Sequence, residues 1–147
     1  MAVPLRGRVV LDTNVFIDYL RAGLHSDWVA GQVEGVTRFL SSVVVMELRL
    51  GADTPKRNRA IDRLIGAFPA SRVISPTPDL YGRAARLFRR IHGGIGAMGD
   101  RLGPVNDLLI ALSAWRIGAT VATNNADDFR VIARHLSGLR WGPPQGR

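Results

Sequence analysis

Residues 104–129, PVNDLLIALSAWRIGATVATNNADDF, contain the pattern that decides the fold. The part from about Val105 to Ile117 is apolar on nearly all sides, which predicts a buried helix. Ala119 to Thr123 is a short apolar run of strand length, and the polar residues NNADD after it predict a turn. A buried helix followed at once by a buried strand favours an α/β protein, in which helices cover a parallel sheet.

The amino-terminal segment also changes from strand to helix. Arg8 to Asp12 (RVVLD) is too short for a helix and too apolar for an exposed strand. We therefore expect a buried strand that ends in a carboxylate. The helix that follows is expected to run to about Arg21, with Thr13 or Asn14 as its N-cap and Gly23 as its stop signal.

Strand and helix signals alternate through the middle of the chain. Residues 41–52 (SSVVVMELRLGA) fit a strand by their valine run and a helix by the spacing of Val44 and Leu48. Thr54 and Pro55 form an N-cap and first-turn pair that predicts the start of a clearer helix. The other expected elements are a short helix at 26–35, strands at 37–41 and 72–75, a long helix from Pro78, a short helix after the NNADD turn and an edge strand at 139–141.

Together these elements predict an α/β fold with a mostly parallel sheet flanked by helices. The length of 147 residues fits one domain. We expect this domain to span residues 1–147, with its core at about 8–141 and a flexible tail at 142–147. The glycine-rich stretch at 93–104 is expected to be a loop, and the sequence assigns it no role.

The residue types that are missing exclude several kinds of site. The chain has no cysteine, which rules out disulfides, thiolate zinc sites and cysteine nucleophiles. The three histidines lack the spacing of zinc ligands. No apolar run near the start suits a signal peptide, and none is long enough for a membrane span. We therefore expect a cytoplasmic protein without a membrane partner.

The charge of the chain indicates a polyanionic partner. The net charge is +8, and Lys56 is the only lysine among the 20 basic residues, so the excess is carried by arginine. Such an excess favours binding to nucleic acid. Acidic protein partners would satisfy the same field, and an arginine-rich proteome would raise the charge without any function.

Three carboxylates lie where the surrounding sequence is apolar. Asp12 ends the predicted buried strand, Glu47 interrupts a run of Val, Met and Leu, and Asp107 lies near the start of the most apolar helix. A buried, ionised carboxylate costs several kcal/mol unless another group compensates it. One divalent cation such as Mg²⁺ or Mn²⁺ would compensate all three, since these ions prefer oxygen ligands.

Each of these carboxylates also has a purely structural interpretation. Asp12 fits an Asx-type helix cap, Glu47 fits a surface ion pair with Arg49 or another arginine, and Asp107 fits an acid in the first turn of a helix. Taken singly, the three residues leave both interpretations open. Taken together, in this order on a basic chain, the three carboxylates form a pattern that favours a shared metal site.

That pattern resembles the PIN-domain family of ribonucleases. VVLDTNVFIDYL at 9–20 resembles the opening of PIN domains, where an Asp of a DTN or DTS motif binds metal. SSVVVMELRLGA resembles their second motif, a Glu on a helix shortly after a Ser. The segment 104–129 resembles the third and fourth motifs together, and the likeness spans roughly residues 8–133. The size and single-domain plan resemble the toxins of bacterial VapBC toxin–antitoxin pairs.

The resemblance implies a set of site residues. It makes Asp12, Glu47 and Asp107 the catalytic ligands of Mg²⁺ or Mn²⁺. In many relatives an Asp follows the motif Thr by two residues, but that slot holds Asn125 here, which leaves one or two metals open. Asp128 would contribute directly or through water, while Asp127 faces solvent. The residues implied to orient the ligands are Asn14, Thr123 and Asn125.

The implied activity is metal-dependent cleavage of RNA phosphodiesters by an activated water. The resemblance also implies a VapB-like antitoxin, which presents an arginine to the acidic site, and a homodimer. Four arginines on the long helix after Pro78 are candidates for phosphate contacts, although a solvated helix face explains them equally well: Arg83, Arg86, Arg89 and Arg90. The RNA that is cut and the identity of the antitoxin cannot be derived from the sequence.

Three other interpretations were weighed. Gly94, Gly96 and Gly99 spell GxGxxG, but a dinucleotide site needs this motif between a strand and a helix, and here it follows a helix. A phosphotransferase of the haloacid-dehalogenase type also begins with a strand and an Asp, yet Asn14 occupies its second acidic position. A non-catalytic module that binds RNA or protein is the main alternative to the nuclease.

Overall fold

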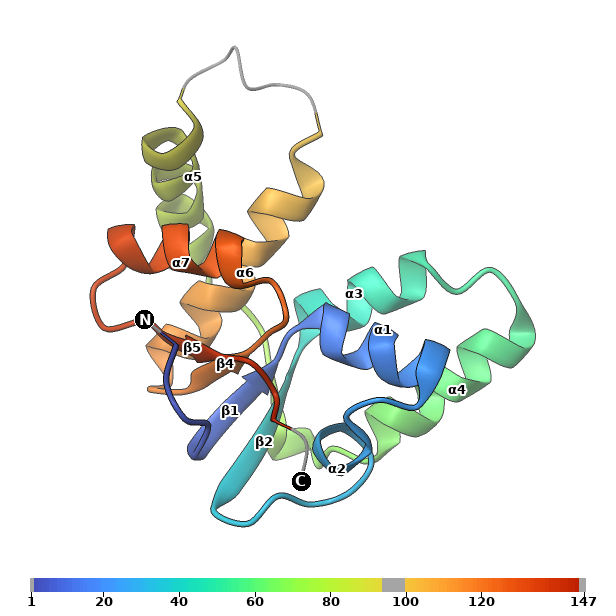
Figure 1. Ribbon diagram of the computed structural model, residues 1–147. Helices are drawn as coiled ribbons and strands as arrows, with labels where there is room; N and C mark the ends of the chain where they lie inside the picture. The colour runs from blue at the N-terminus through green and yellow to red at the C-terminus, as the bar shows by residue number, and fades with distance from the viewer. Residues whose placement is uncertain (1, 94–99, 146–147) are drawn as a thin grey trace.

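A five-stranded parallel sheet forms the centre of the protein. The computed structural model describes residues 2–93 and 100–145. The strands follow the order β3-β2-β1-β4-β5, and every neighbouring pair is parallel (Figure 1). Their bounds are β1 Gly7–Leu11, β2 Val36–Ser41, β3 Val73–Ile74, β4 Thr120–Ala122 and β5 Arg140–Gly142. The predicted α/β class is thus confirmed, with a sheet that is parallel throughout.

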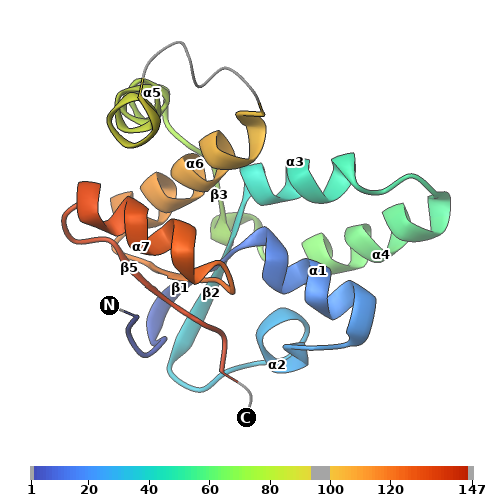
Figure 2. The ribbon, with the colours of Figure 1, turned by 45° about the horizontal axis from the view of Figure 1, so that its top comes forward.

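Helices cover both sides of this sheet. The described residues form helices α1 Thr13–Ala22, α2 Ser26–Val29, α3 Ser42–Leu50, α4 Pro55–Gly66, α5 Pro78–His92, α6 Leu102–Arg116 and α7 Ala126–His135, with a 3₁₀ turn, η1, at Ala70–Arg72. Both ribbon views show α1, α2 and α4 on one side and α5, α6 and α7 on the other (Figure 2). Helix α3 lies between them and contacts α1, α4 and α6. No helix in residues 2–93 and 100–145 has the length and apolarity to cross a membrane.

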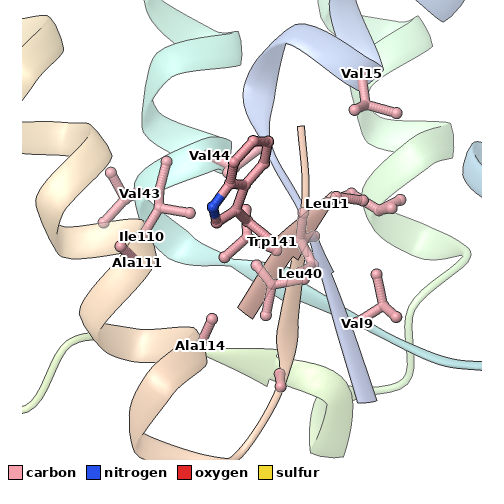
Figure 3. Packing of buried hydrophobic residues seen from close by; sticks show 14 of the residues in the cluster. Val9, Leu11, Val15, Leu40, Val43, Val44, Ile110, Ala111, Ala114 and Trp141 are labelled. Atoms are coloured by element: carbon pink, nitrogen blue, oxygen red, sulfur yellow. The ribbon is translucent and has the colours of Figure 1, made fainter. Parts of the chain in front are cut away.

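The core lies between the sheet and its helices. Val9, Val10 and Leu11 of β1 are completely buried, because β1 is the central strand and both its faces are covered. Helix α6 is buried along most of its length, as its apolar sequence predicted. Figure 3 labels Ile110 and Ala114 of this helix in the buried cluster that also includes Leu40 of β2 and Trp141 of β5.

Several local signals form the elements that they predicted. Thr54 is the N-cap of α4 and accepts a hydrogen bond from the Arg57 N–H, with Pro55 in the first turn. Gly23 ends α1 in the left-handed conformation, at φ 69°, where a side chain would be strained. The stretch at 41–52, which fitted both a strand and a helix, forms the end of β2 and then α3, with the Ser41 hydroxyl accepting from the Val43 N–H.

Three predicted boundaries are corrected by the structure. The N-cap of α1 is Asp12, not Thr13 or Asn14, because the Asp12 carboxylate accepts the Thr13 N–H. The helix expected at 26–35 is a single turn. Helix α6 begins at Leu102, three residues before the predicted start. Glycines 94, 96 and 99, and with them most of the predicted glycine-rich loop, lie outside the described residues.

The carboxyl-terminal segment contacts the rest of the domain beyond residue 141, where the core was expected to end. Gly142 belongs to β5, and its carbonyl accepts a hydrogen bond from the Thr123 N–H. The backbone carbonyl of Gln145 accepts a hydrogen bond from the Trp28 indole over 2.9 Å. An edge strand alone predicts neither contact, because both partners are distant in sequence.

The strand order creates one position where a site is expected. The chain passes from β1 to β2 on one side, and β4 joins β1 on the other side. In open parallel sheets, ligands bind at the carboxyl ends of the strands where the order reverses. Asp12 follows β1 at this point, and Thr123 follows β4.

Candidate active site

Asp12 lies at the centre of the candidate site. Its side chain is 3% exposed, and three neighbours donate hydrogen bonds to it. Oδ1 accepts the Thr13 N–H over 2.9 Å. Oδ2 accepts the Thr123 hydroxyl over 2.7 Å and the Asn14 amide over 3.1 Å. Asn14 and Thr123, which were expected to orient the ligands, therefore both hold the same oxygen of Asp12.

Burial nevertheless disfavours the ionised form of Asp12. Desolvation raises the pKa of this carboxyl group to about 6, and the nearby Glu47 charge adds to the increase. The hydrogen bonds from Thr123, Thr13 and Asn14 act in the opposite direction and limit the increase. Among the described residues, no basic side chain forms an ion pair with Asp12.

Glu47 reaches the same place from α3. Its Oε1 accepts a hydrogen bond from the Thr13 hydroxyl over 2.6 Å, which joins α3 to α1. The surface ion pair with Arg49 that the sequence allowed does not form. Arg49 instead pairs with Asp62 of α4. Glu47 is thus left half-buried beside Asp12, without a cation among its described contacts.

Asp107 has the most perturbed carboxyl group of the cluster. Desolvation raises its pKa to about 8, and the charges of Asp12, Asp128 and Glu47 raise it further, in that order. Because α6 begins at Leu102, Asp107 lies beyond the first turn, and the first-turn interpretation is wrong. The structure therefore brings all four predicted acidic residues close enough to affect one titration.

The structure also distinguishes the two neighbouring acids of α7. Asp128 lines a small cavity of about 100 Å³ together with Asp107 and His92. The amide of Asn125 donates to Asp128 Oδ2 over 2.8 Å, so Asn125 orients this carboxylate. Asp127 has a side chain that is 96% exposed and pairs with Arg130, as expected for a solvent-facing residue.

The donor set suits a hydrated Mg²⁺ or Mn²⁺ ion. The site contains four carboxylates, those of Asp12, Glu47, Asp107 and Asp128. Within residues 2–93 and 100–145, none of the four forms an ion pair with a basic side chain. No three Asp, Glu or His side chains of that part of the chain are spaced as ligands of one ion. Mg²⁺ usually keeps several waters and takes only one or two carboxylates directly. The cluster fits that mode, with the remaining acids reached through water.

Four residues around the site were not identified as functional from the sequence. Thr13 was considered only as a cap, yet its hydroxyl binds Glu47. Asn124 donates its backbone N–H to Asn14 Oδ1 over 3.1 Å, and its amide contacts both Asp18 and His25. The one available signal was the spacing of Asn14 and Asp18, which puts them on one face of α1.

The arginines of α5 lie on the helix that contacts α6 and α7. Arg83 stacks on the Trp115 ring, with its guanidinium carbon 4.6 Å from the ring centroid. Arg86, Arg89 and Arg90 are exposed. Three of the four arginines are therefore free of packing constraints, whereas Arg83 has a structural contact of its own.

Comparison with known proteins agrees with this geometry. The family model described as "PIN domain" matches residues 9–135. The chain is 28% identical over 137 residues to the VapC ribonuclease Mb1587 of Mycobacterium bovis, and equally so to ribonuclease VapC11 of Mycobacterium tuberculosis. Both alignments cover 86% of this chain and 92% of the relative.

Solved structures with the same fold cover nearly the whole chain. VapBC-1 from nontypeable Haemophilus influenzae has a chain that is 25% identical, with a TM-score of 0.61 and coverage of 93% of this chain and 98% of that chain. FitAB bound to the IR36 DNA fragment gives 25% identity, a TM-score of 0.62 and coverage of 92% and 94%. Because the family model matches residues 9–135, most of the sequence, the chain belongs to the PIN domain family.

Proposed function

We propose that this protein is a metal-dependent endoribonuclease and the toxin of a toxin–antitoxin pair. The observation that carries the proposal is the cluster of Asp12, Glu47, Asp107 and Asp128 at the carboxyl ends of β1 and β4. Carboxylates that raise one another's pKa are costly without a cation. Membership of the PIN family argues against a phosphotransferase of the haloacid-dehalogenase type. The VapC relatives support ribonuclease activity.

The residues of the site have separate tasks in this proposal. A bound Mg²⁺ or Mn²⁺ would activate water and offset the charge that develops on the phosphate. Asp12, Glu47 and Asp107 would hold the ion, one or two of them directly and the others through water, and Asp128 would contribute directly or through water. Thr123 and Asn14 fix Asp12 Oδ2, so Oδ1, which accepts only the Thr13 N–H among the described hydrogen bonds, keeps a lone pair for the ion.

RNA is the proposed substrate because it matches both the site and the charge. The acidic cluster would repel phosphate without its cation, whereas the net charge of +8 attracts the RNA backbone. The exposed Arg86, Arg89 and Arg90 on α5 are candidates for these contacts. RNA binding to the intact protein should therefore weaken steeply as the salt concentration rises.

The direct test is an RNA cleavage assay. Purified protein is incubated with total RNA and Mg²⁺ or Mn²⁺, beside an EDTA control and the Asp12→Asn variant, and the cut ends are mapped. We expect defined cuts that disappear in both controls. Intact RNA under every metal, from folded protein free of antitoxin, would contradict the nuclease and support the non-catalytic binding module.

A VapB-like antitoxin is the proposed protein partner. Solved neighbours such as VapBC-1 and FitAB are complexes, which supports a partner of this kind. A groove of about 640 Å³ lies between α1, α3 and α4, and Glu47 is one of its lining residues. The groove is also lined by apolar residues such as Ile17 and Leu48 and by basic residues such as Arg57. An antitoxin segment in this groove would bring an arginine to the acidic cluster. Expression without the antitoxin should arrest growth, and normal growth with abundant folded protein would count against the toxin assignment.

A cytoplasmic homodimer is the proposed state of the toxin. The described helices include none suited to a membrane, and the expected RNA substrates are cytoplasmic. Exposed apolar side chains on the outer helices, such as Tyr81 of α5 and Leu50 of α3, are available for contacts between copies. Light scattering should give twice the monomer mass of 16.0 kDa, and a monomeric mass would refute the dimer.

A further inference from the structure

A second polar cluster lies one helical turn along α1 from the acidic site. Asp18 projects from α1, His25 precedes α2, and Asn124 follows β4. The Asn124 amide donates to Asp18 Oδ2 over 2.7 Å and lies 3.3 Å from His25 Nε2. His25 Nε2 also lies 3.4 Å from Asp18 Oδ2. Three segments that are distant in sequence thus meet through their side chains.

This cluster is connected to the proposed metal ligand Asp12. The backbone N–H of Asn124 donates to Asn14 Oδ1 over 3.1 Å. Because this contact fixes the carbonyl side of the Asn14 amide, Nδ2 must face the other way. Nδ2 donates to Asp12 Oδ2 over 3.1 Å and lies 3.2 Å from the Thr123 hydroxyl. The orientation of Asn14, and with it one oxygen of Asp12, therefore depends on where Asn124 is held.

The backbone of His25 is strained at this position. Its φ is 59°, and it is the one non-glycine residue with a positive φ among those that the structure describes. Such a conformation is unfavourable for a residue with a side chain, and it persists when the surroundings impose it. His25 makes no side-chain hydrogen bond as the cap of α2, and its side chain is 16% exposed. Its contacts are directed at Asp18 and Asn124 instead of at the helix that it precedes.

We propose that His25 and Asp18 are positioning residues for the metal site. They hold the Asn124 segment so that its N–H orients Asn14, and Asn14 then fixes Asp12 with Oδ1 free for the ion. The strained backbone of His25 is the cost of placing the imidazole against Asn124. This inference rests on the proposed function, because Asp12 is a ligand only in that proposal.

The test compares His25→Gly with Leu24→Gly. Glycine accepts a positive φ without strain, so His25→Gly removes the imidazole and keeps the backbone conformation. Leu24 is an exposed neighbour in the same connection, and its replacement by glycine controls for added loop flexibility. Thermal unfolding of both variants checks folding, and His25→Gly should unfold at a temperature close to that of the wild type.

Two readouts do not depend on RNA cleavage. In the metal-free protein, ¹⁵N NMR should show that His25→Gly shifts the Asn14 side-chain amide and the Asn124 backbone amide, while Leu24→Gly leaves both in place. Titration with Mn²⁺ should show a threefold to tenfold loss of affinity in His25→Gly alone, at or below the 10–100-fold range of groups that contact a ligand directly.

The outcomes separate this inference from the nuclease proposal. Altered amide signals and weaker Mn²⁺ binding in His25→Gly support the inference, even if neither protein cuts RNA. Unchanged Asn14 and Asn124 signals, or Mn²⁺ affinity equal to the wild type, overturn it, even if the wild type is an active ribonuclease. A wild type that binds no Mn²⁺ overturns both proposals.

Discussion

The hydroxyl group of Thr13 donates a hydrogen bond of 2.6 Å to Glu47 Oε1 and connects the first turn of α1 to α3. Thr13 directly follows Asp12 and is 8% exposed, so this contact fixes one carboxylate of the site relative to another. The two residues are 34 positions apart in the chain. The acidic cluster is therefore held by uncharged donors, which can orient the carboxylates without neutralising them.

Replacing Thr13 should test this contact. Thr13→Val keeps the shape of the side chain and removes the donor, so the free energy of unfolding should fall by about 1–2 kcal/mol and Mn²⁺ binding should weaken several-fold. Thr13→Ser keeps the hydroxyl and should retain most of the Mn²⁺ affinity. Urea unfolding and Mn²⁺ titration measure the two effects. Equal Mn²⁺ affinity in the Val and Ser variants would show that the contact does not organise the site.

The stability of the metal-free protein should fall as the pH rises. The pKa values of Asp12 and Asp107 are raised from 3.8 to about 6 and about 8 in the folded protein. Well below pH 3.8 both groups are protonated in the folded and unfolded states, so they do not affect stability. Above that pH the unfolded chain releases protons that the folded protein still holds, which favours unfolding until the folded groups ionise as well.

Denaturant unfolding in EDTA measures this effect. Between pH 5 and pH 8 the free energy of unfolding should decrease by several kcal/mol through these two groups, with the larger part coming from Asp107. Asp107→Asn removes the more perturbed carboxyl group and should flatten much of the dependence. A free energy of unfolding that increases over this pH range in the wild type would contradict the raised pKa values.

Added Mg²⁺ or Mn²⁺ should stabilise the protein more at pH 8 than at pH 5. The cation competes with protons for Asp12 and Asp107, and at higher pH fewer protons remain on them. The shift in melting temperature on adding the metal should therefore increase with pH. Asp12→Asn should lose most of this shift. A metal effect that is equal at both pH values would indicate that the ion binds elsewhere.

Asp127 and Asp128 offer a matched pair of substitutions. They are adjacent acids of α7, but Asp128 affects the Asp107 titration and Asp127 is exposed beside Arg130. Asp128→Asn should lower the pKa of Asp107 and weaken Mn²⁺ binding about tenfold. Asp127→Asn should change neither property. A ¹³C NMR titration of the Asp107 carboxyl group tests the first effect, and equal behaviour of the two variants would remove Asp128 from the site.

Arg38 should be important for stability, although it lies outside the acidic site. Its guanidinium group donates to the carbonyls of Trp28 and Val29 over 2.8 Å and 2.7 Å and stacks on the Phe68 ring. Burial lowers its pKa, which reflects the cost of the buried charge. Arg38→Met leaves both carbonyls without this donor and should cost about 3 kcal/mol in urea unfolding, with Arg38→Lys intermediate. A loss below about 0.5 kcal/mol would show that Arg38 does not hold α2 on the sheet.

The elements that could be predicted are those with strong local signals. The apolar sequence of α6, the strand before Asp12 and the Thr54-Pro55 start of α4 each determine their structure through neighbours in the chain. Residues 41–52 could not be assigned in this way. Their valines suit a strand or a buried helix, and the Ser41 cap and packing against α1 and α6 settle the choice only in the folded protein.

The same distinction applies to the site. Asp12, Glu47 and Asp107 could be identified because a carboxylate in an apolar segment is anomalous and because the motifs resemble a family. The contact from Asn124 to Asn14 joins residues 110 positions apart, so the sequence around either residue does not predict it. Asp128 could only be suggested, since its place in the cluster depends on how Asn125 and the start of α7 fold after β4.

The parallel sheet has a consequence for the time at which activity can begin. Asp12 directly follows β1, whereas the neighbouring strand β4 and the acid Asp128 come much later in the chain. A nascent chain on the ribosome therefore lacks part of the cluster until β4 and the start of α7 have been made. If the protein cuts RNA, it remains harmless to the message and the ribosome that are producing it, and a freshly made antitoxin has that interval in which to be present first.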